Sequence, residues 1–68
     1  MNEDTLNMEI RKYLKKVGVT SQREIEHAVH KAIESGKLKA TDSIDVKMVL
    51  DIPGIDLNYC IEGKIALE

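Results

Sequence analysis

Apolar side chains recur along the first part of the chain with the spacing of a helix face. Between residues 3 and 17 they follow one another at intervals of one, three or four residues, which places them on a single side of a helix. These residues are Leu6, Ile10, Tyr13, Leu14 and Val17. Gly18 comes next, and glycine commonly ends helices because it adopts the left-handed conformation without strain. The pattern predicts a first amphipathic helix over residues 3–17.

A second helix is predicted over residues 21–35. Ser21 is followed three positions later by Glu24, the arrangement of a capping box, in which two side chains satisfy free backbone N–H groups at a helix start. The apolar side of this segment comprises Ile25, Ala28, Val29, Ala32 and Ile33. Gly36 then serves as the expected terminator.

From Ile44 onward the period of the pattern changes from that of a helix to two. Apolar and polar residues alternate over residues 44–52 and again over 55–61, which is typical of strands with one buried face. A hairpin centred on Pro53 and Gly54 would put all alternating apolar residues on one face, although a proline there disfavours the tightest turns and leaves a wider loop open. Gly63 lies within a second turn signal, which predicts a short third strand over residues 64–67.

These elements predict an α+β fold of the order ααβββ. Two N-terminal amphipathic helices would pack on one face of a C-terminal antiparallel sheet of two or three strands, in a single domain spanning residues 1–68. No internal repeat or linker divides the chain.

Composition narrows the classes of function. The chain has 68 residues, 10 Lys and Arg against 12 Asp and Glu, and a net charge of −2. Such a short chain has little surface to spare for a large enzymatic cleft. The lack of a basic excess argues against nucleic acid as the default partner. Residues 1–40 are nevertheless mildly basic, whereas residues 41–68 are acidic.

A basic cluster in the first predicted helix is the most suggestive charged feature. It consists of Arg11, Lys12, Lys15 and Lys16. Two helices around a glycine-containing turn also invite comparison with helix-turn-helix DNA-binding proteins. The match is poor, because Leu14 stands where that motif has a small residue and Glu24 where it has an apolar one. A solvated helix face is the simpler interpretation.

Three other groups contain residue types that are common in functional sites, but each lacks a further residue or a pocket that such a site requires. His27 and His30 are spaced as two metal ligands on one helix would be, with Glu26 or Glu34 nearby, but the chain has no further His and its only Cys is distant in sequence. Asp51 and Asp56 flank the predicted turn without an enclosing pocket. Cys60 has no neighbouring base, and the expected pairing places it opposite Lys47. We therefore predict no catalytic, cofactor-binding or metal-ligating residue, and no cofactor.

The expected location is the reducing cytoplasm, with no membrane association. A single cysteine cannot form an internal disulfide, the N-terminus does not resemble a secretory signal, and no apolar run reaches the roughly 18 residues of a membrane span.

Three segments carry a resemblance to a known family. The opening MNEDT, the stretch KVGVTSQREIE and the ending EGKIALE resemble a family of short bacterial proteins known as a domain of unknown function. The resemblance extends over nearly the whole chain. It implies a compact bacterial cytoplasmic protein without assigned activity, so it adds no site residues.

Two classes of function remain after these exclusions. We expect a non-enzymatic protein-interaction module, with a protein partner or a second copy as its ligand and no small molecule. It would use the outer sheet face, where Val49 is exposed out of phase with the core, or an edge strand. The alternative is a nucleic-acid-binding module of helix-turn-helix or winged-helix type, using the basic cluster together with Arg23.

Overall fold

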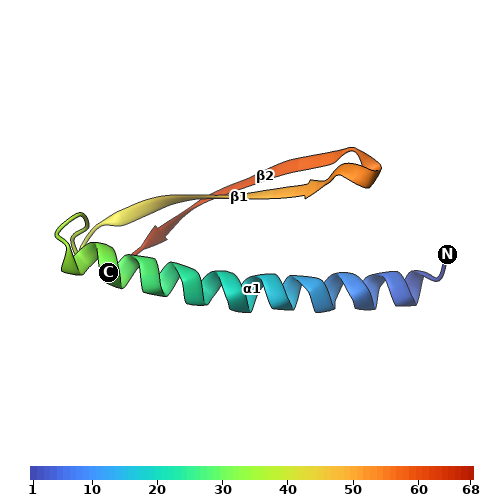
Figure 1. Cartoon of the computed structure of the whole chain (residues 1–68), viewed down its shortest axis with the longest axis horizontal. Coiled ribbons are helices and arrows are strands. Elements are labelled where there is room, and N and C mark those ends of the chain that lie inside the picture. The colour runs from blue at the N-terminus through green and yellow to red at the C-terminus, as the bar shows by residue number, and fades with distance from the viewer. The chain divides into compact units, whose positions relative to one another are not determined.

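The chain forms one long helix followed by a two-stranded hairpin (Figure 1). The computed structural model describes residues 1–68, which divide into two compact units, Met1–Lys37 and Leu38–Glu68. The element order is α1 (Glu3–Glu34), β1 (Ser43–Ile52), the 3-10 turn η1 (Pro53–Ile55) and β2 (Leu57–Ala66). The predicted order ααβββ is therefore wrong, and the observed order is αββ.

The two predicted helices are one continuous helix. Residues 18–20, expected to form the turn between them, are helical, and Gly18 does not take a positive φ. A glycine inside a helix costs only about 1 kcal/mol relative to alanine, and good helix formers flank it on both sides. Three of the apolar residues also stay on one side of the helix across the glycine, because Leu6, Val17 and Ala28 recur every eleven residues, or three helical turns.

Both ends of α1 are capped by local hydrogen bonds. The side chain of Asn2 accepts a hydrogen bond from the backbone N–H of Thr5 at 3.1 Å. At the other end Gly36 has a φ of 80°, and the N–H of Lys37 donates to the carbonyl of Ala32 at 2.9 Å. This is the Schellman arrangement. The predicted terminator Gly36 is confirmed, whereas the predicted capping box at Ser21 is wrong because that residue lies inside the helix.

The hairpin has a wider turn than the two residues first expected. Ile52 pairs with Leu57, so four residues separate the strands, and Asp56 takes the left-handed conformation with a φ of 55°. The expected pairing of Ile52 with Ile55 is wrong by two residues. Since side chains alternate with a period of two, a shift of two keeps every side chain on its expected face. The single apolar face of the hairpin is confirmed.

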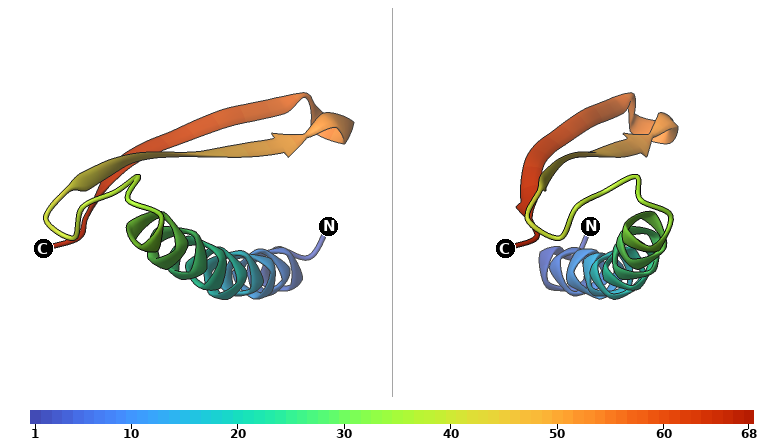
Figure 2. Two further views of the ribbon diagram at one scale, coloured as in Figure 1. Left: turned by 60° about the vertical axis from the view of Figure 1, so that its left-hand side comes forward. Right: turned by 90° about the vertical axis from the view of Figure 1, so that its left-hand side faces the viewer.

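The predicted third strand does not exist. β2 runs straight through Gly63, which pairs with Val46, and the ladder extends further when the N–H of Leu67 donates to the carbonyl of Asp42 at 3.0 Å. A turn at Gly63 would have ended the pairing between the strands at this residue. Instead, the residues before and after Gly63 are paired with residues of opposite charge on β1. Lys47 lies opposite Glu62, and Asp45 lies opposite Lys64. Figure 2 shows the resulting long, twisted ribbon from two further sides.

Neither unit contains a buried residue. Large apolar side chains are exposed in both, including Leu14 at 54% in α1 and Ile61 at 54% in β2. A lone helix and a lone hairpin cannot enclose a side chain, so neither unit has a core of its own.

Candidate interaction surfaces

One side of α1 is an apolar stripe that runs along the helix. We define the stripe as Leu6, Ile10, Tyr13, Leu14, Val17, Ile25, Ala28, Val29, Ala32 and Ile33. Its N-terminal members are exposed, with Ile10 at 45% and Tyr13 at 60%. Around its midpoint is an open hollow of about 330 Å³, lined by Tyr13, Lys16, Val17, Thr20 and Ser21. At 100° per residue the stripe turns by about 80° between its N-terminal and C-terminal halves, and an apolar face of this kind is what a helix presents to a protein neighbour.

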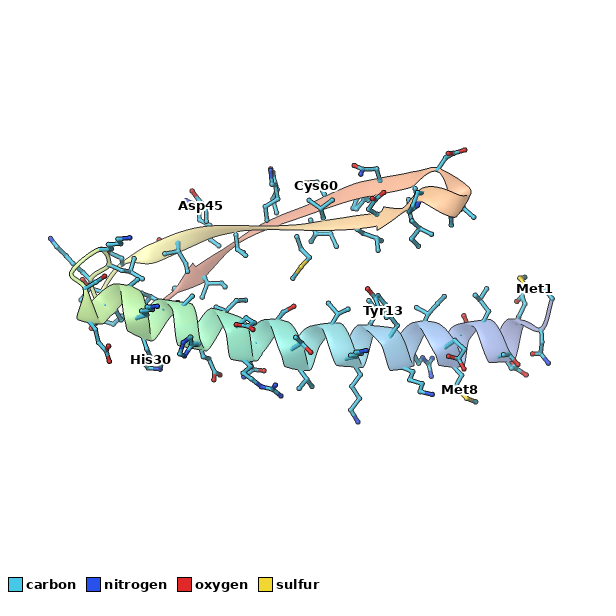
Figure 3. All side chains as sticks on the ribbon, in the orientation of Figure 1. Met1, Met8, Tyr13, His30, Asp45 and Cys60 are labelled. Carbon is cyan, nitrogen blue, oxygen red and sulfur yellow. The ribbon has the colours of Figure 1, made fainter.

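The opposite side of α1 is polar. Met8 and His30 project away from the side that carries Tyr13 (Figure 3). The basic cluster of residues 11–16 is fully exposed, and none of its side chains forms an ion pair within the chain. The helix-turn-helix geometry that would have presented this cluster to DNA is absent, because α1 has no turn.

The hairpin has one apolar face that both strands contribute. Its members are Ile44, Val46, Met48, Leu50, Ile52, Leu57, Tyr59, Ile61 and Ile65. Tyr59, opposite Leu50, is 61% exposed. A two-stranded hairpin is marginally stable by itself, and its apolar face needs a covering layer.

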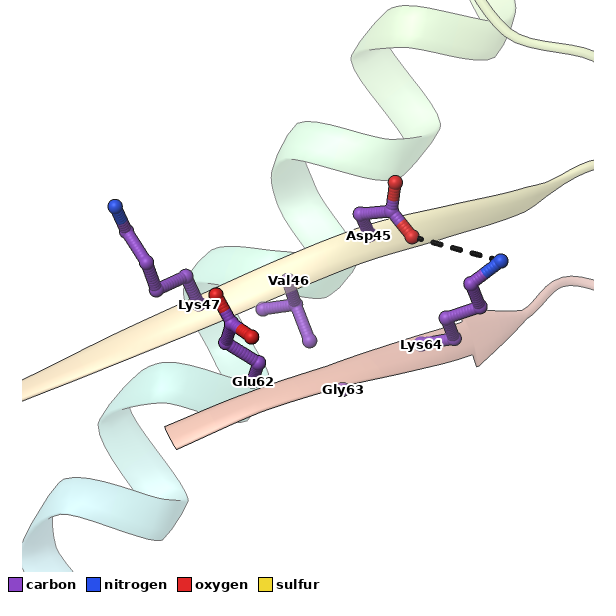
Figure 4. Close-up of a pocket in the computed structure, with 6 residues that line it drawn as sticks. All are labelled: Asp45, Val46, Lys47, Glu62, Gly63 and Lys64. Carbon is purple, nitrogen blue, oxygen red and sulfur yellow. Dashed lines mark ion pairs between the residues drawn. The ribbon is translucent and has the colours of Figure 1, made fainter. Parts of the chain in front are cut away.

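The other face of the hairpin is mostly polar. Lys64 Nζ lies 3.8 Å from Asp45 Oδ1, an exposed ion pair of the kind that adds little to stability. Beside this pair is a hollow of about 520 Å³ lined by both strands (Figure 4). Asp45, Val46, Lys47, Glu62, Gly63 and Lys64 line it. The hollow has charges of both signs and is not enclosed, so it has no strong preference for an ionic ligand.

The remaining candidate residues are not brought together. Cys60 is exposed and lies opposite Val49, not opposite Lys47 as expected, because the register is shifted by two. Asp51 lies opposite Asn58 on the ladder, while Asp56 lies in the turn. The two carboxylates therefore do not face each other as the narrower turn would have required.

Neither a metal cluster nor a membrane-spanning helix is found. Nowhere do three or more His, Cys, Asp or Glu side chains gather in a way that could hold a metal ion. Although α1 is long, it is not apolar enough to cross a bilayer. His27 and His30 share the exposed, polar part of α1 without a further ligand.

Together these features define a small helix-plus-hairpin protein in which the helix and the hairpin each have an apolar face that is not buried within their own unit. The chain belongs to DUF6494, a family of unknown function, whose family model matches residues 1–68. The resemblance to a domain of unknown function is thereby confirmed over the full chain. No curated protein and no solved structure matches it.

Proposed function

We propose that this protein is a non-enzymatic protein-interaction module that associates with a second copy of itself. One observation carries the proposal: neither α1 nor the hairpin has a buried side chain, yet each has a continuous apolar face. Contiguous exposed apolar surface of this kind marks protein contact sites. A standard interface buries about 800 Å² per partner, and the apolar faces of α1 and of the hairpin offer surface for such an interface.

Sedimentation equilibrium tests self-association, with two matched variants. Ile10→Asp places a charge on the apolar stripe, and Met8→Asp places the same charge on the opposite side of α1, two residues away. We expect the parent chain and Met8→Asp to self-associate alike, and Ile10→Asp to associate at least tenfold more weakly, because an exposed Ile that becomes buried contributes about 1.5–3 kcal/mol. A strict monomer at high concentration contradicts the self-association, and a monomer that also captures no protein partner contradicts the interaction module as a whole.

The nucleic-acid alternative is tested on the same samples. Duplex DNA and single-stranded RNA are titrated into the protein at low salt while the amide shifts of residues 11–16 are followed. We expect no shifts. Binding that weakens steeply with salt, and is lost when Lys12 and Lys15 are both changed to Glu, would instead identify phosphate as the ligand of the basic cluster.

A further inference from the structure

We propose that two copies of this chain join through the free edge of β2, strand against strand in antiparallel orientation, with Gly63 of one copy opposite Gly63 of the other. This inference rests on the proposed function and names the part of the hairpin that takes part in self-association. The hairpin alone supplies every residue of this contact.

β2 has one edge paired with β1 and one free edge. The N–H of Leu67 donates to the carbonyl of Asp42, which continues the register of the ladder. In an antiparallel ladder such hydrogen-bonded pairs alternate with pairs that make no bond to each other, so every second residue of β2 turns its backbone groups away from β1. These residues are Asn58, Cys60, Glu62, Lys64 and Ala66. Since the sheet has no third strand, their N–H and C=O groups form a row with which another strand can pair.

No proline and no bulge interrupts β2. The register is continuous from Leu57 to Ala66, and these are the features that often keep an edge from pairing. Glycine inside a strand often marks a bulge or a place where another backbone comes close. A Cβ at Gly63 would meet only Val46 Cγ1, at the ordinary contact distance of 3.8 Å, so space within the hairpin does not require a glycine there. Close approach of a second backbone fits a glycine at this position.

Charge complementarity selects the register of the two β2 strands. With Gly63 on the two-fold axis, Glu62 of one copy lies opposite Lys64 of the other, and the axis forms this contact twice. Moving the axis by one residue would set Glu62 opposite Glu62 or Lys64 opposite Lys64. Like charges directly opposite each other destabilise a sheet, whereas opposite charges stabilise it. The register centred on Gly63 is therefore favoured over its two neighbours.

The same register extends the charge pattern of the hairpin across the joined sheet. Within one copy Lys64 Nζ lies 3.8 Å from Asp45 Oδ1, and Glu62 lies opposite Lys47 (Figure 4). Each row across the two hairpins then contains Asp45 and Lys64 of one copy, followed by Glu62 and Lys47 of the other. The charges alternate in sign at every step, and the two-fold axis produces two such rows. A single exposed ion pair adds little, but a network of several charges contributes more.

The apolar faces of the two hairpins become one face in this arrangement. Directly opposite residues of antiparallel strands project from the same side of a sheet. Ile61 therefore lies beside Ile65 of the second copy, and Tyr59 beside Leu67. A two-stranded hairpin is marginally stable by itself, whereas a sheet of three or more strands with an apolar face is not. Joining two copies along β2 gives the hairpin this larger sheet.

The free edge of β1 suits a second copy less well. A pairing centred on Val46 sets Asp42 opposite Leu50, a carboxylate among the apolar side chains. A pairing centred on Val49 stops at Pro53, which has no N–H to donate. The two centres between these place like charges opposite each other, which is unfavourable. The register through Gly63 on β2 has none of these defects.

Amide hydrogen exchange tests the edge without any substitution. At concentrations where the chain self-associates, we expect the N–H groups of Cys60, Glu62 and Lys64 to exchange at least tenfold more slowly than after dilution, because each then donates to the second copy. The N–H groups of Lys47 and Val49, on the free edge of β1, are the internal control and should not change. Slower exchange at Lys47 and Val49 in place of the β2 residues would overturn the pairing.

Disulfide trapping tests the register. In a Cys60→Ser background, Gly63→Cys places a thiol on the proposed axis, where the two Cα atoms would lie about 4.5 Å apart, a distance that suits a disulfide. We expect this variant to form covalent dimers readily under mild oxidation. Lys64→Cys in the same background is the matched control and should cross-link slowly, because position 64 is only a diagonal neighbour of its own copy, about 7–8 Å away. Faster cross-linking of Lys64→Cys would overturn the register.

The outcomes separate this inference from the proposed function. A chain that self-associates without slower exchange along β2, and without a cross-link at residue 63, overturns the edge pairing and leaves the proposed function intact. A strict monomer that captures a different protein overturns both the pairing and the self-association, while the interaction module stands. A monomer that captures no protein overturns the proposed function as well.

Discussion

Gly18 and Gly36 have the same side chain and opposite roles. Gly36 has a φ of 80° and ends α1, whereas Gly18 lies inside the helix with an ordinary φ. A Cβ added at either position would meet no atom within 4 Å, so space does not distinguish them. The difference lies in the backbone conformation alone, and sequence inspection gives both residues the same terminating role.

Substitution of each glycine by alanine should therefore have opposite effects. We expect Gly18→Ala to stabilise the helix by about 0.5–1 kcal/mol, because alanine loses less backbone entropy than glycine. Gly36→Ala should destabilise the helix end by about 1 kcal/mol, because an L residue is strained at positive φ. Thermal unfolding followed by far-UV circular dichroism measures both changes. Loss of helicity in Gly18→Ala would mean that a break at residue 18 is real.

At the scale of elements, the alternation of apolar and polar residues does not determine the register of the hairpin. Pairing shifted by two residues keeps every side chain on the same face, so the apolar face could be predicted while the partner of each residue could not. The four-residue turn from Pro53 to Asp56 decides the register. The continuation of β2 past Gly63 also depends on pairing with Val46, which no local signal around Gly63 reveals.

A single cysteine substitution tests the register, because Cys60 is the only cysteine. Val49→Cys places a thiol directly opposite Cys60, where the distance between Cα atoms in an antiparallel ladder, about 4.5–5.5 Å, suits a disulfide. We expect rapid intramolecular oxidation, measured by loss of free thiol in dilute solution. Lys47→Cys, two residues along the same face, is the matched control and should oxidise slowly, since diagonal neighbours lie about 7–8 Å apart. The reverse order would support the narrower turn.

At the scale of the whole molecule, the proposed self-association makes stability depend on protein concentration. Ten residues form the apolar stripe of α1 and nine form the apolar face of the hairpin, and none of them is buried in its own unit. Folding is driven mainly by burial of apolar surface, so whatever covers these two faces adds to stability.

The melting temperature should consequently rise with protein concentration. Thermal unfolding measured over a hundredfold range of concentration should show an increase of several degrees for the parent chain, because association stabilises only the folded form. Ile10→Asp should melt at a lower temperature that depends little on concentration, whereas Met8→Asp should behave like the parent. A melting temperature independent of concentration in the parent chain would show that stability does not come from self-association.

The sequence by itself determined the helical residues of α1 other than residues 18–20, its end at Gly36, the two alternating strands and the apolar face of each element. These features follow from periodicities of about 3.6 and 2, which depend on backbone geometry over a few residues and are visible in the order of side chains. The in-phase spacing of Leu6, Val17 and Ala28 was a further signal, which indicates one helix once Gly18 is no longer taken as a terminator. From the sequence we also expect no catalytic residue, because it contains no obvious catalytic motif.

Only the tertiary structure decided the continuity of the helix through Gly18, the register of the hairpin and the absence of a third strand. Each depends on which backbone groups pair, and a hydrogen bond between Leu67 and Asp42 has no counterpart in local sequence. The structure likewise showed that no residue is buried within either unit. Periodicity indicates which side of an element is apolar, but only the arrangement of atoms shows whether the element's own unit buries that side.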